Sequence, residues 1–256
     1  MELNSQIKTA LAGADKKILL MTHIVLGYPS LDINRQVIAQ MAANGVDLIE
    51  MQIPFSEPMA DGPVIVKANQ QAIENGITVR GCLDFAREMT TTHAIPFLFM
   101  TYYNILFKFG VEKFLREAKE INIKGFIIPD LPPEEGEEFF VLADKYGIAP
   151  IMIFAPTSTA ARMQELSRFG RGFIYCAARK GVTGKQTDFD GEFNDYLGRC
   201  RANTGLPLAV GFGISRKEDV DYLTGKADIA VIGTKTINLV EEKGIAAVGP
   251  FIAGLR

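Results

Sequence analysis

The feature that most constrains the fold of this sequence is a set of eight apolar, β-rich segments spaced along the whole chain. They span residues 17–27, 46–53, 96–104, 125–130, 149–156, 172–178, 206–214 and 228–234. Most of them are continuously apolar rather than alternating, which is typical of strands buried on both faces of a parallel sheet. The sequence therefore predicts a parallel sheet that is covered on both sides.

Segments with helical spacing lie between the predicted strands. They span 31–44, 64–76 with 79–89, 110–121, 133–146, 159–169, 190–203 and 216–224, with a last helix from about 235. Helix start signals support two of them: Pro near the first turn in "PDLPPEE" (129–135), and Ser215 as the expected N-cap of the segment that follows it. The first residues, "MELNSQIKTALAGADKK", indicate a short amphipathic helix before the first strand.

Eight strands alternating with about eight helices in 256 residues match a single (β/α)8 barrel, or TIM barrel, with an extra N-terminal helix. No composition break or linker divides the chain, so we expect one domain, 1–256. A doubly wound open sheet is the alternative. That fold usually has a Gly-rich turn after its first strand, and "GYPS" (27–30) lacks the spacing of a dinucleotide site.

Composition argues against several functional classes. The net charge is −3 and the basic residues are scattered, so the chain has no footprint for nucleic acid. No apolar run approaches the length of a membrane span. The three cysteines have no metal-ligand spacing, and two histidines argue against a His-based zinc site. The odd cysteine count and the absence of a signal peptide favour a reducing cytoplasm.

Two carboxylates stand out in "IEMQIPFSEPMADGP" (49–63), where Glu50 interrupts an apolar strand and Asp61 follows in a loop bracketed by Pro and Gly. One interpretation is a surface loop with a satisfied acid at a strand end. The other is a catalytic acid–base pair, because a strand end holds a side chain still while the adjacent loop shapes a pocket. In a (β/α)8 barrel, functional residues lie at the C-terminal ends of the strands.

Glycines cluster in the last three predicted strand–helix connections, at Gly181, Gly184, Gly211, Gly213 and Gly233. Glycine lets backbone N–H groups approach a ligand, and a following helix N-terminus adds partial positive charge. In these barrels the loops after strands 7 and 8 form the recurrent phosphate site. The glycines could instead serve only tight turns, but their convergence predicts a small phosphorylated metabolite bound by backbone donors.

The stretch "DLIEMQIPFSEPMADGPVI" (47–65) resembles the pattern E-L-G-x-P-F-S-D-P-x-A-D-G-P of the tryptophan synthase alpha subunit family. Further family segments follow in the same order: "MTYYN" (100–104), "PDLPPEE" (129–135), "APTST" (155–159), "RKGVTG" (179–184) and "VGFGIS" (210–215). The resemblance covers nearly the whole chain.

This resemblance implies a carbon–carbon lyase of tryptophan biosynthesis that cleaves indole-3-glycerol phosphate to indole and glyceraldehyde 3-phosphate by retro-aldol chemistry. It also implies no cofactor in this chain, and a PLP-dependent beta subunit that receives the indole in an alpha2beta2 complex. Two alternatives stay open. The chain could be a stand-alone lyase that releases free indole, or a ligand-sensing activator, which would not need an acid–base pair.

The resemblance also implies roles for individual residues. Glu50 would exchange protons with the substrate, and Asp61 would stay ionised and accept a hydrogen bond from indole N1–H. Thr183 lies on a Gly-rich loop, 179–190, that is expected to close over the site. The other implied substrate contacts are Tyr175, Phe212, Met100 and Ile127, and the implied phosphate-binding residues are Gly184, Gly213, Gly233 and Thr234.

Several positions depart from the family pattern. Gln52 replaces the usual Gly, Glu57 the usual Asp, Val66 the usual Gln, Thr234 the usual Ser, and Ile105 the usual Pro. His23 stands where a pocket Phe is usual, and could stack on indole as Phe does or signal an altered substrate, although a lone His is more often structural. Gln52 and Glu57 flank the loop that is expected to meet the beta subunit.

Overall fold

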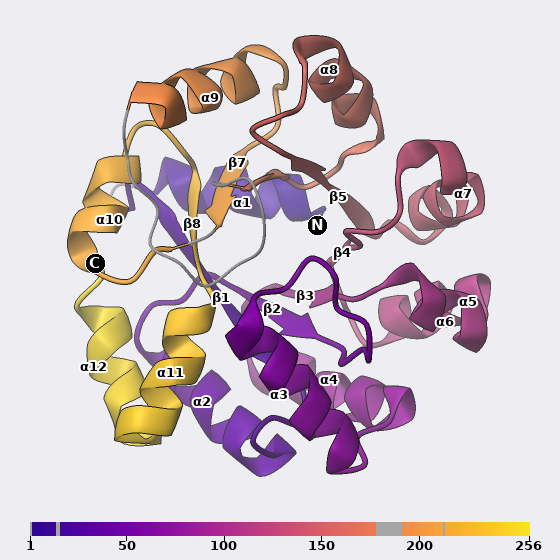
Figure 1. Cartoon of the computed structure of the whole chain (residues 1–256), viewed down its shortest axis with the longest axis vertical. Coiled ribbons are helices and arrows are strands. Elements are labelled where there is room, and N and C mark those ends of the chain that lie inside the picture. The colour runs from indigo at the N-terminus through magenta and orange to yellow at the C-terminus, as the bar shows by residue number, and fades with distance from the viewer. Residues whose placement is uncertain (1, 14–15, 178–190, 212) are drawn as a thin grey trace.

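The eight strands of the protein close into a parallel barrel in sequence order, β1 to β8, which confirms the predicted (β/α)8 architecture (Figure 1). This computed structural model describes residues 2–13, 16–177, 191–211 and 213–256. The strands are β1 Leu19–Val25, β2 Leu48–Gln52, β3 Phe97–Met100, β4 Gly125–Ile127, β5 Ala149–Phe154, β6 Ile174–Ala177, β7 Leu208–Gly211 and β8 Ile229–Ile232.

Helices surround the barrel, as Figure 1 shows. The α-helices are α1 Leu3–Ala12, α2 Leu31–Ala43, α3 Pro63–Glu74, α4 Val79–Thr92, α5 Tyr103–Phe109, α6 Val111–Glu120, α7 Glu137–Tyr146, α8 Ala160–Phe169, α9 Gly191–Ala202, α10 Lys217–Leu223, α11 Thr234–Lys243 and α12 Val248–Ala253. Two 3-10 turns, η1 Pro133–Glu135 and η2 Ile245–Ala247, precede α7 and α12.

The core has two layers, because successive side chains of a strand point to opposite faces. Leu20 and Ile24 of β1 point outward into the layer between barrel and helices. Residues of the inner layer, which fills the barrel, include Leu19, Met21, Leu48, Leu98, Ile151, Phe173, Ala209, Ile229 and Val231. Both faces of the strands are therefore apolar, which explains their continuous apolar sequence.

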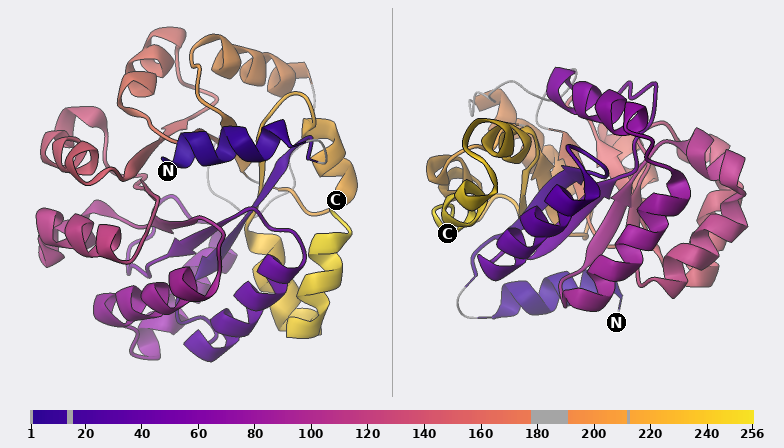
Figure 2. Two further views of the ribbon diagram at one scale, coloured as in Figure 1. Left: turned by 180° about the vertical axis from the view of Figure 1, so that it is seen from behind. Right: turned by 90° about the horizontal axis from the view of Figure 1, so that it is seen from below.

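Helix α1 closes the N-terminal end of the barrel, and Figure 2 shows it lying across that end. Its Leu3 and Ile7 are buried in the inner layer. Gly172 makes room for this packing: it has φ +72°, and a Cβ there would lie 2.8 Å from Leu3 Cδ2. The predicted extra helix is thus confirmed, and the C-terminal end of the barrel is left for a site.

Three local features differ from the sequence-based expectations. The expected strand 96–104 ends at Met100, and α5 begins at Tyr103. The expected helix 133–146 divides at Gly136 into η1 and α7; a Cβ at Gly136 would lie 2.5 Å from Phe140 Cε2.

The expectation that Ser215 caps the next helix is wrong by one residue. Arg216 is the N-cap of α10. Asp219 Oδ2 accepts hydrogen bonds from the backbone N–H groups of Ser215 and Arg216, at 2.8 and 3.2 Å. The side chain that accepts these hydrogen bonds is therefore Asp219, which lies inside the helix. The presence of Ser215 in the sequence does not indicate this arrangement.

Within the described ranges, no helix has both the length and the apolar character needed to cross a lipid bilayer.

Candidate active site

Glu50 and His23 form a buried pair near the C-terminal ends of β2 and β1. The two residues are register partners in the parallel β1–β2 ladder. His23 follows the inward-pointing Leu19 and Met21 at a spacing of two, so it shares their face. His23 Nδ1 lies 3.0 Å from Glu50 Oε1, and the two residues are only 5% and 4% exposed.

Asp61 is held in place from the β2–α3 loop by two donors. Gln52 Nε2 and Tyr102 Oη donate hydrogen bonds to Asp61 Oδ2, at 2.7 and 3.0 Å. The Tyr102 hydroxyl also accepts from the Ala60 backbone N–H at 3.1 Å, and its ring stacks on Phe55 with centroids 5.0 Å apart. This network fixes Asp61 on the inner side of the loop, at the end of the barrel opposite α1.

The environment of Asp61 raises the pKa of its carboxyl group. Burial is the largest cause and raises its pKa above the ordinary 3.8, and the negative charge of Glu50 raises it further. His23 and the hydrogen bonds from Gln52 and Tyr102 lower the pKa and offset part of this effect. The expectation that Asp61 stays ionised therefore depends on these partners, because burial alone favours the neutral acid.

For His23, the effect of neighbouring groups on the pKa outweighs the effect of burial. Burial is the largest single contribution and lowers its pKa. The charge and hydrogen bond of Glu50, then Asp61 and Gln52, raise the pKa, and together they bring it above the ordinary 6.5. The imidazole is therefore held by the carboxylates around it, and it keeps its proton to higher pH than a free histidine does.

Tyr175 lies in β6 on the same inner layer as these carboxylates. Burial, and then the charges of Glu50 and Asp61, raise the pKa of its hydroxyl well above 10. The phenol is therefore neutral in the working pH range. Its ring packs over Gly211, where a Cβ would lie 2.1 Å from Tyr175 Oη.

The other residues implied by the sequence fall into three groups. Met100 and Ile127 are buried in the inner apolar layer that Tyr175 packs against. Gly213, Gly233 and Thr234 lie at the C-terminal ends of β7 and β8. Thr183, Gly184 and Phe212 lie outside the described residues.

The N-terminus of α11 is close to His23. Gly233 is the residue before α11 and gives no side-chain cap to that helix. A Cβ at Gly233 would lie 3.8 Å from His23 Cβ. Gly213 has φ +85°, a conformation that favours glycine. The N-terminus of α11 can therefore bind an anion beside the buried carboxylates.

Sequence reasoning did not assign the partners of the two carboxylates. Gln52 and His23 appear there only as departures from a family pattern, and Tyr102 only as a letter within "MTYYN". The signal available was the spacing of two that places Gln52 on the same face as Glu50. Among the described residues, no group of three His, Cys, Asp or Glu side chains is arranged to bind a metal ion.

Two buried carboxylates, Glu50 in contact with His23 and Asp61 with Gln52 and Tyr102, lie beside a neutral tyrosine at the C-terminal end of a (β/α)8 barrel. This combination defines the class of barrel enzymes that work by acid–base chemistry on a small substrate.

Comparison with known proteins agrees with this class and narrows it. The sequence profile of the family described as "Tryptophan synthase alpha chain" matches residues 10–248. The tryptophan synthase alpha chain of Desulfotalea psychrophila is 65% identical over 242 residues, covering 94% of this chain and 95% of that protein. The one from Syntrophotalea carbinolica is 57% identical over 243 residues, covering 95% and 96%.

Solved structures share the fold of this chain. A protein from Aquifex aeolicus superposes with a TM-score of 0.91 at 33% identity, covering 100% of this chain and 98% of that chain. A tryptophan synthase complex from Pyrococcus furiosus superposes with a TM-score of 0.84 at 27% identity, covering 93% and 97%. The chain belongs to the tryptophan synthase alpha chain family, and it is a lyase of tryptophan biosynthesis.

Proposed function

We propose that this chain cleaves indole-3-glycerol phosphate to indole and glyceraldehyde 3-phosphate through Glu50 and Asp61. The observation that carries the proposal is that, within the described part of the chain, each carboxylate is held through one oxygen and not through the other. Glu50 Oε2 is buried without a hydrogen-bond partner among the described residues. Among the described residues, the hydrogen bonds to the Asp61 side chain go to Oδ2.

Glu50 would act first as acid and then as base. Its carboxyl delivers a proton to indole C3, which makes that carbon tetrahedral and leaves positive charge on the ring at N1. The resulting carboxylate removes the C3′ hydroxyl proton. As the C3′–O double bond forms, the C3–C3′ bond breaks and its electrons return to the indole ring. The proton balance closes, and Glu50 ends the cycle protonated.

Asp61 would stabilise the charge that develops on the ring. Its carboxylate accepts a hydrogen bond from N1–H, and this interaction strengthens as N1 becomes positive. Gln52 and Tyr102 support this role by holding Oδ2, which leaves Oδ1 for the substrate. Their hydrogen bonds also favour the ionised form, against the effect of burial.

The phosphate group would bind at the N-terminus of α11, with backbone N–H groups as donors. Gly213, Gly233 and Thr234 support this proposal, because they bring glycine backbone and a helix start to the same end of the barrel as Glu50. Tyr175, Met100 and Ile127 would line the space between phosphate and carboxylates. Thr183, Gly184 and Phe212 keep the roles that the family resemblance implies.

A partner subunit would bind on the outer side of the β2–α3 loop. The loop carries Asp61 inward, whereas Ser56 and Glu57 are exposed and Met59 is 76% exposed. Met59 would offer the partner an exposed side chain of a type that is enriched at protein interfaces. The related protein from Pyrococcus furiosus was solved as a tryptophan synthase complex. We infer a PLP-dependent beta subunit that receives indole in an alpha2beta2 assembly.

A product assay tests this function directly. The purified chain is incubated with indole-3-glycerol phosphate, and indole and glyceraldehyde 3-phosphate are measured separately, with and without a beta subunit. Equal amounts of both products, released faster when the beta subunit is present, are expected. Equal rates in both arms would favour a stand-alone lyase, and no cleavage in either arm would refute the proposal.

A further inference from the structure

The His23–Glu50 pair has an arrangement that goes beyond holding a buried acid in place. Only one atom of each side chain is used in the contact between Nδ1 and Oε1, at 3.0 Å. The remaining polar atoms, His23 Nε2 and Glu50 Oε2, are buried and have no partner in the part of the chain that is described. The contact with His23 therefore distinguishes the two oxygens of the Glu50 carboxylate.

We propose that His23 is a positioning residue, which holds Glu50 Oε1 through Nδ1–H so that Oε2 is the oxygen that exchanges protons with the substrate. This inference rests on the proposed acid–base role of Glu50.

The position of His23 in the fold makes it suited to this role. It shares strand register with Glu50, so the two backbones are fixed by the β1–β2 ladder and the side chains leave on one face. A short, rigid imidazole on a strand of the closed barrel has little freedom to leave its partner. A catalytic group supported in this way keeps its geometry better than one on a loop.

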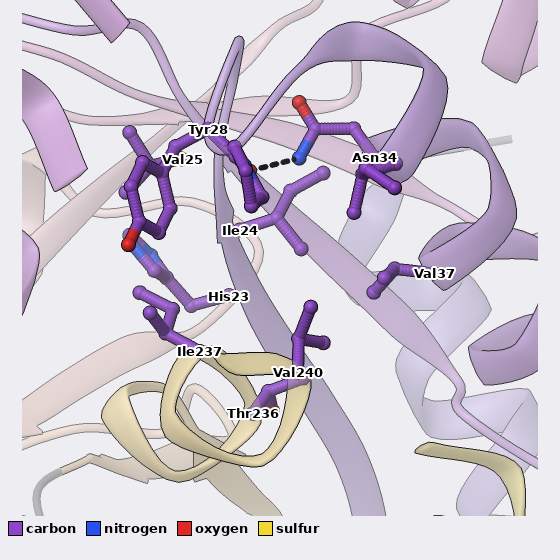
Figure 3. Close-up of a pocket in the computed structure, with 11 residues that line it drawn as sticks. His23, Ile24, Val25, Tyr28, Asn34, Val37, Thr236, Ile237 and Val240 are labelled. Carbon is purple, nitrogen blue, oxygen red and sulfur yellow. Dashed lines mark hydrogen bonds between the residues drawn. The ribbon is translucent and has the colours of Figure 1, made fainter. Parts of the chain in front are cut away.

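The surroundings of the imidazole leave Glu50 as its nearest acid. On the barrel side, the groups that influence its pKa are Glu50, Asp61 and Gln52. On the side of α2 and α11, His23 borders a cavity of ≈ 30 Å³ whose lining includes Tyr28, Asn34 and Thr236 (Figure 3). None of the described residues that line the cavity is a lysine, an arginine or a carboxylic acid.

The charge balance agrees with the geometry. Burial lowers the pKa of His23, and Glu50 is the strongest of the influences that bring it above 6.5. The protonated imidazole is therefore stabilised by the carboxylate that it contacts. A neutral side chain at position 23 would remove the titration of His23 from the active site.

Three substitutions separate positioning from simple packing. His23→Asn keeps an amide donor at the position of Nδ1, whereas His23→Gln moves the donor to about the position of Nε2. His23→Phe keeps a ring and removes both donors. We expect kcat about 10-fold lower in His23→Phe and His23→Gln with KM unchanged, and kcat largely recovered in His23→Asn, since a hydrogen bond to a charged group is worth roughly that factor or more.

The pH profile gives a readout that packing would not move. In the wild type, kcat should fall as pH rises through the raised pKa of His23, above 6.5. This limb should be lost or moved in all three variants, including the active His23→Asn. Identical profiles in all four proteins, equal kcat in His23→Asn and His23→Gln, or a KM change alone would overturn the proposal.

A spectroscopic titration covers the case in which a variant at position 23 fails to fold. The chain has two histidines, so the imidazole signals of His23 and His93 are separated by comparison with His93→Gln. His23 should titrate above 6.5 in the wild type and at lower pH in Glu50→Gln, because the main influence that raises its pKa is gone. A pKa that does not respond to Glu50→Gln would overturn the proposal.

Glu50→Gln also separates this inference from the proposed function. If Glu50→Gln still releases indole at the wild-type rate, the role of Glu50 itself is wrong. If Glu50→Gln is inactive while the His23 variants match the wild type in kcat and pH profile, only the positioning role of His23 is wrong.

Discussion

Gly211 lies directly against the ring of Tyr175. A Cβ at position 211 would be 2.1 Å from Tyr175 Oη, 2.5 Å from Cζ and 2.6 Å from Cε1. Two ring carbons and the hydroxyl oxygen lie close to the same point, so a rotation of the O–H bond cannot relieve the contact. Because Gly211 of β7 has no side chain, Tyr175 of β6 can lie beside Glu50 and Asp61.

Gly211→Ala should displace Tyr175 and reduce turnover with little loss of structure. We expect kcat/KM to fall about 100-fold, since a shift of about 1 Å near the reacting atoms has that order of effect. Gly205→Ala is the matched control, because a Cβ there meets no atom within 4 Å. Steady-state kinetics and circular dichroism check both variants; a Gly211→Ala enzyme with normal kcat/KM would contradict this placement of Tyr175.

Asp61→Asn should abolish cleavage and yet stabilise the protein. Because the folded-state pKa of Asp61 is raised, the stability that its neutral form contributes is present below 3.8 and is lost as pH rises through the folded pKa. Asparagine cannot ionise, so the variant does not lose this stability as pH rises. The urea midpoint of the variant should therefore exceed that of the wild type at pH 7, and the gap should shrink towards pH 4. A less stable variant at pH 7 would contradict the burial effect.

Gln52→Leu tests the partner of Asp61. It removes one of the two donors to Asp61 Oδ2 and leaves Tyr102 as the other. Losing a hydrogen bond that lowers the pKa of Asp61 should raise that pKa further, so the acid limb of the kcat profile moves to higher pH. At pH 7 we expect about a 10-fold loss of kcat. An unmoved acid limb would mean that Asp61 does not set it.

Glu57→Ala should weaken activation by the partner while the isolated chain keeps its basal rate. Glu57 is exposed on the loop whose inner side carries Asp61, so the loop can couple a docked partner to the site. Glu120→Ala is the control, since Glu120 ends α6 at the opposite end of the barrel. Indole formation is measured across a beta-subunit titration. Equal activation of both variants would place the docking surface elsewhere.

The architecture could be predicted because its signal is local and repeated. Strands buried on both faces, such as β3 and β8, are continuously apolar, and the eight segments repeat this pattern along the chain. Helix α5 was missed because Tyr103–Phe109 is short and apolar and follows β3 after only two residues, so it resembles the strand before it. Length and periodicity carry too little information there.

The site was predicted in part for a similar reason. Glu50 is conspicuous because an acid interrupts an apolar strand, and Asp61 because prolines and glycine bracket it. Their partners depend on contacts across the barrel. His23 meets Glu50 only through the β1–β2 register, and Tyr102 meets Asp61 from 41 residues away in the sequence. A single sequence records neither relationship.

The most direct test of this account is the turnover of Glu50→Gln. The amide keeps the size and hydrogen bonding of the side chain but cannot cycle a proton. We expect kcat for indole formation to fall by at least ~10²–10⁴-fold, the usual contribution of general acid–base catalysis, while a glycerol phosphate analogue binds with nearly unchanged affinity. Near-normal indole formation by Glu50→Gln would contradict the assignment of Glu50 as the group that exchanges protons with the substrate.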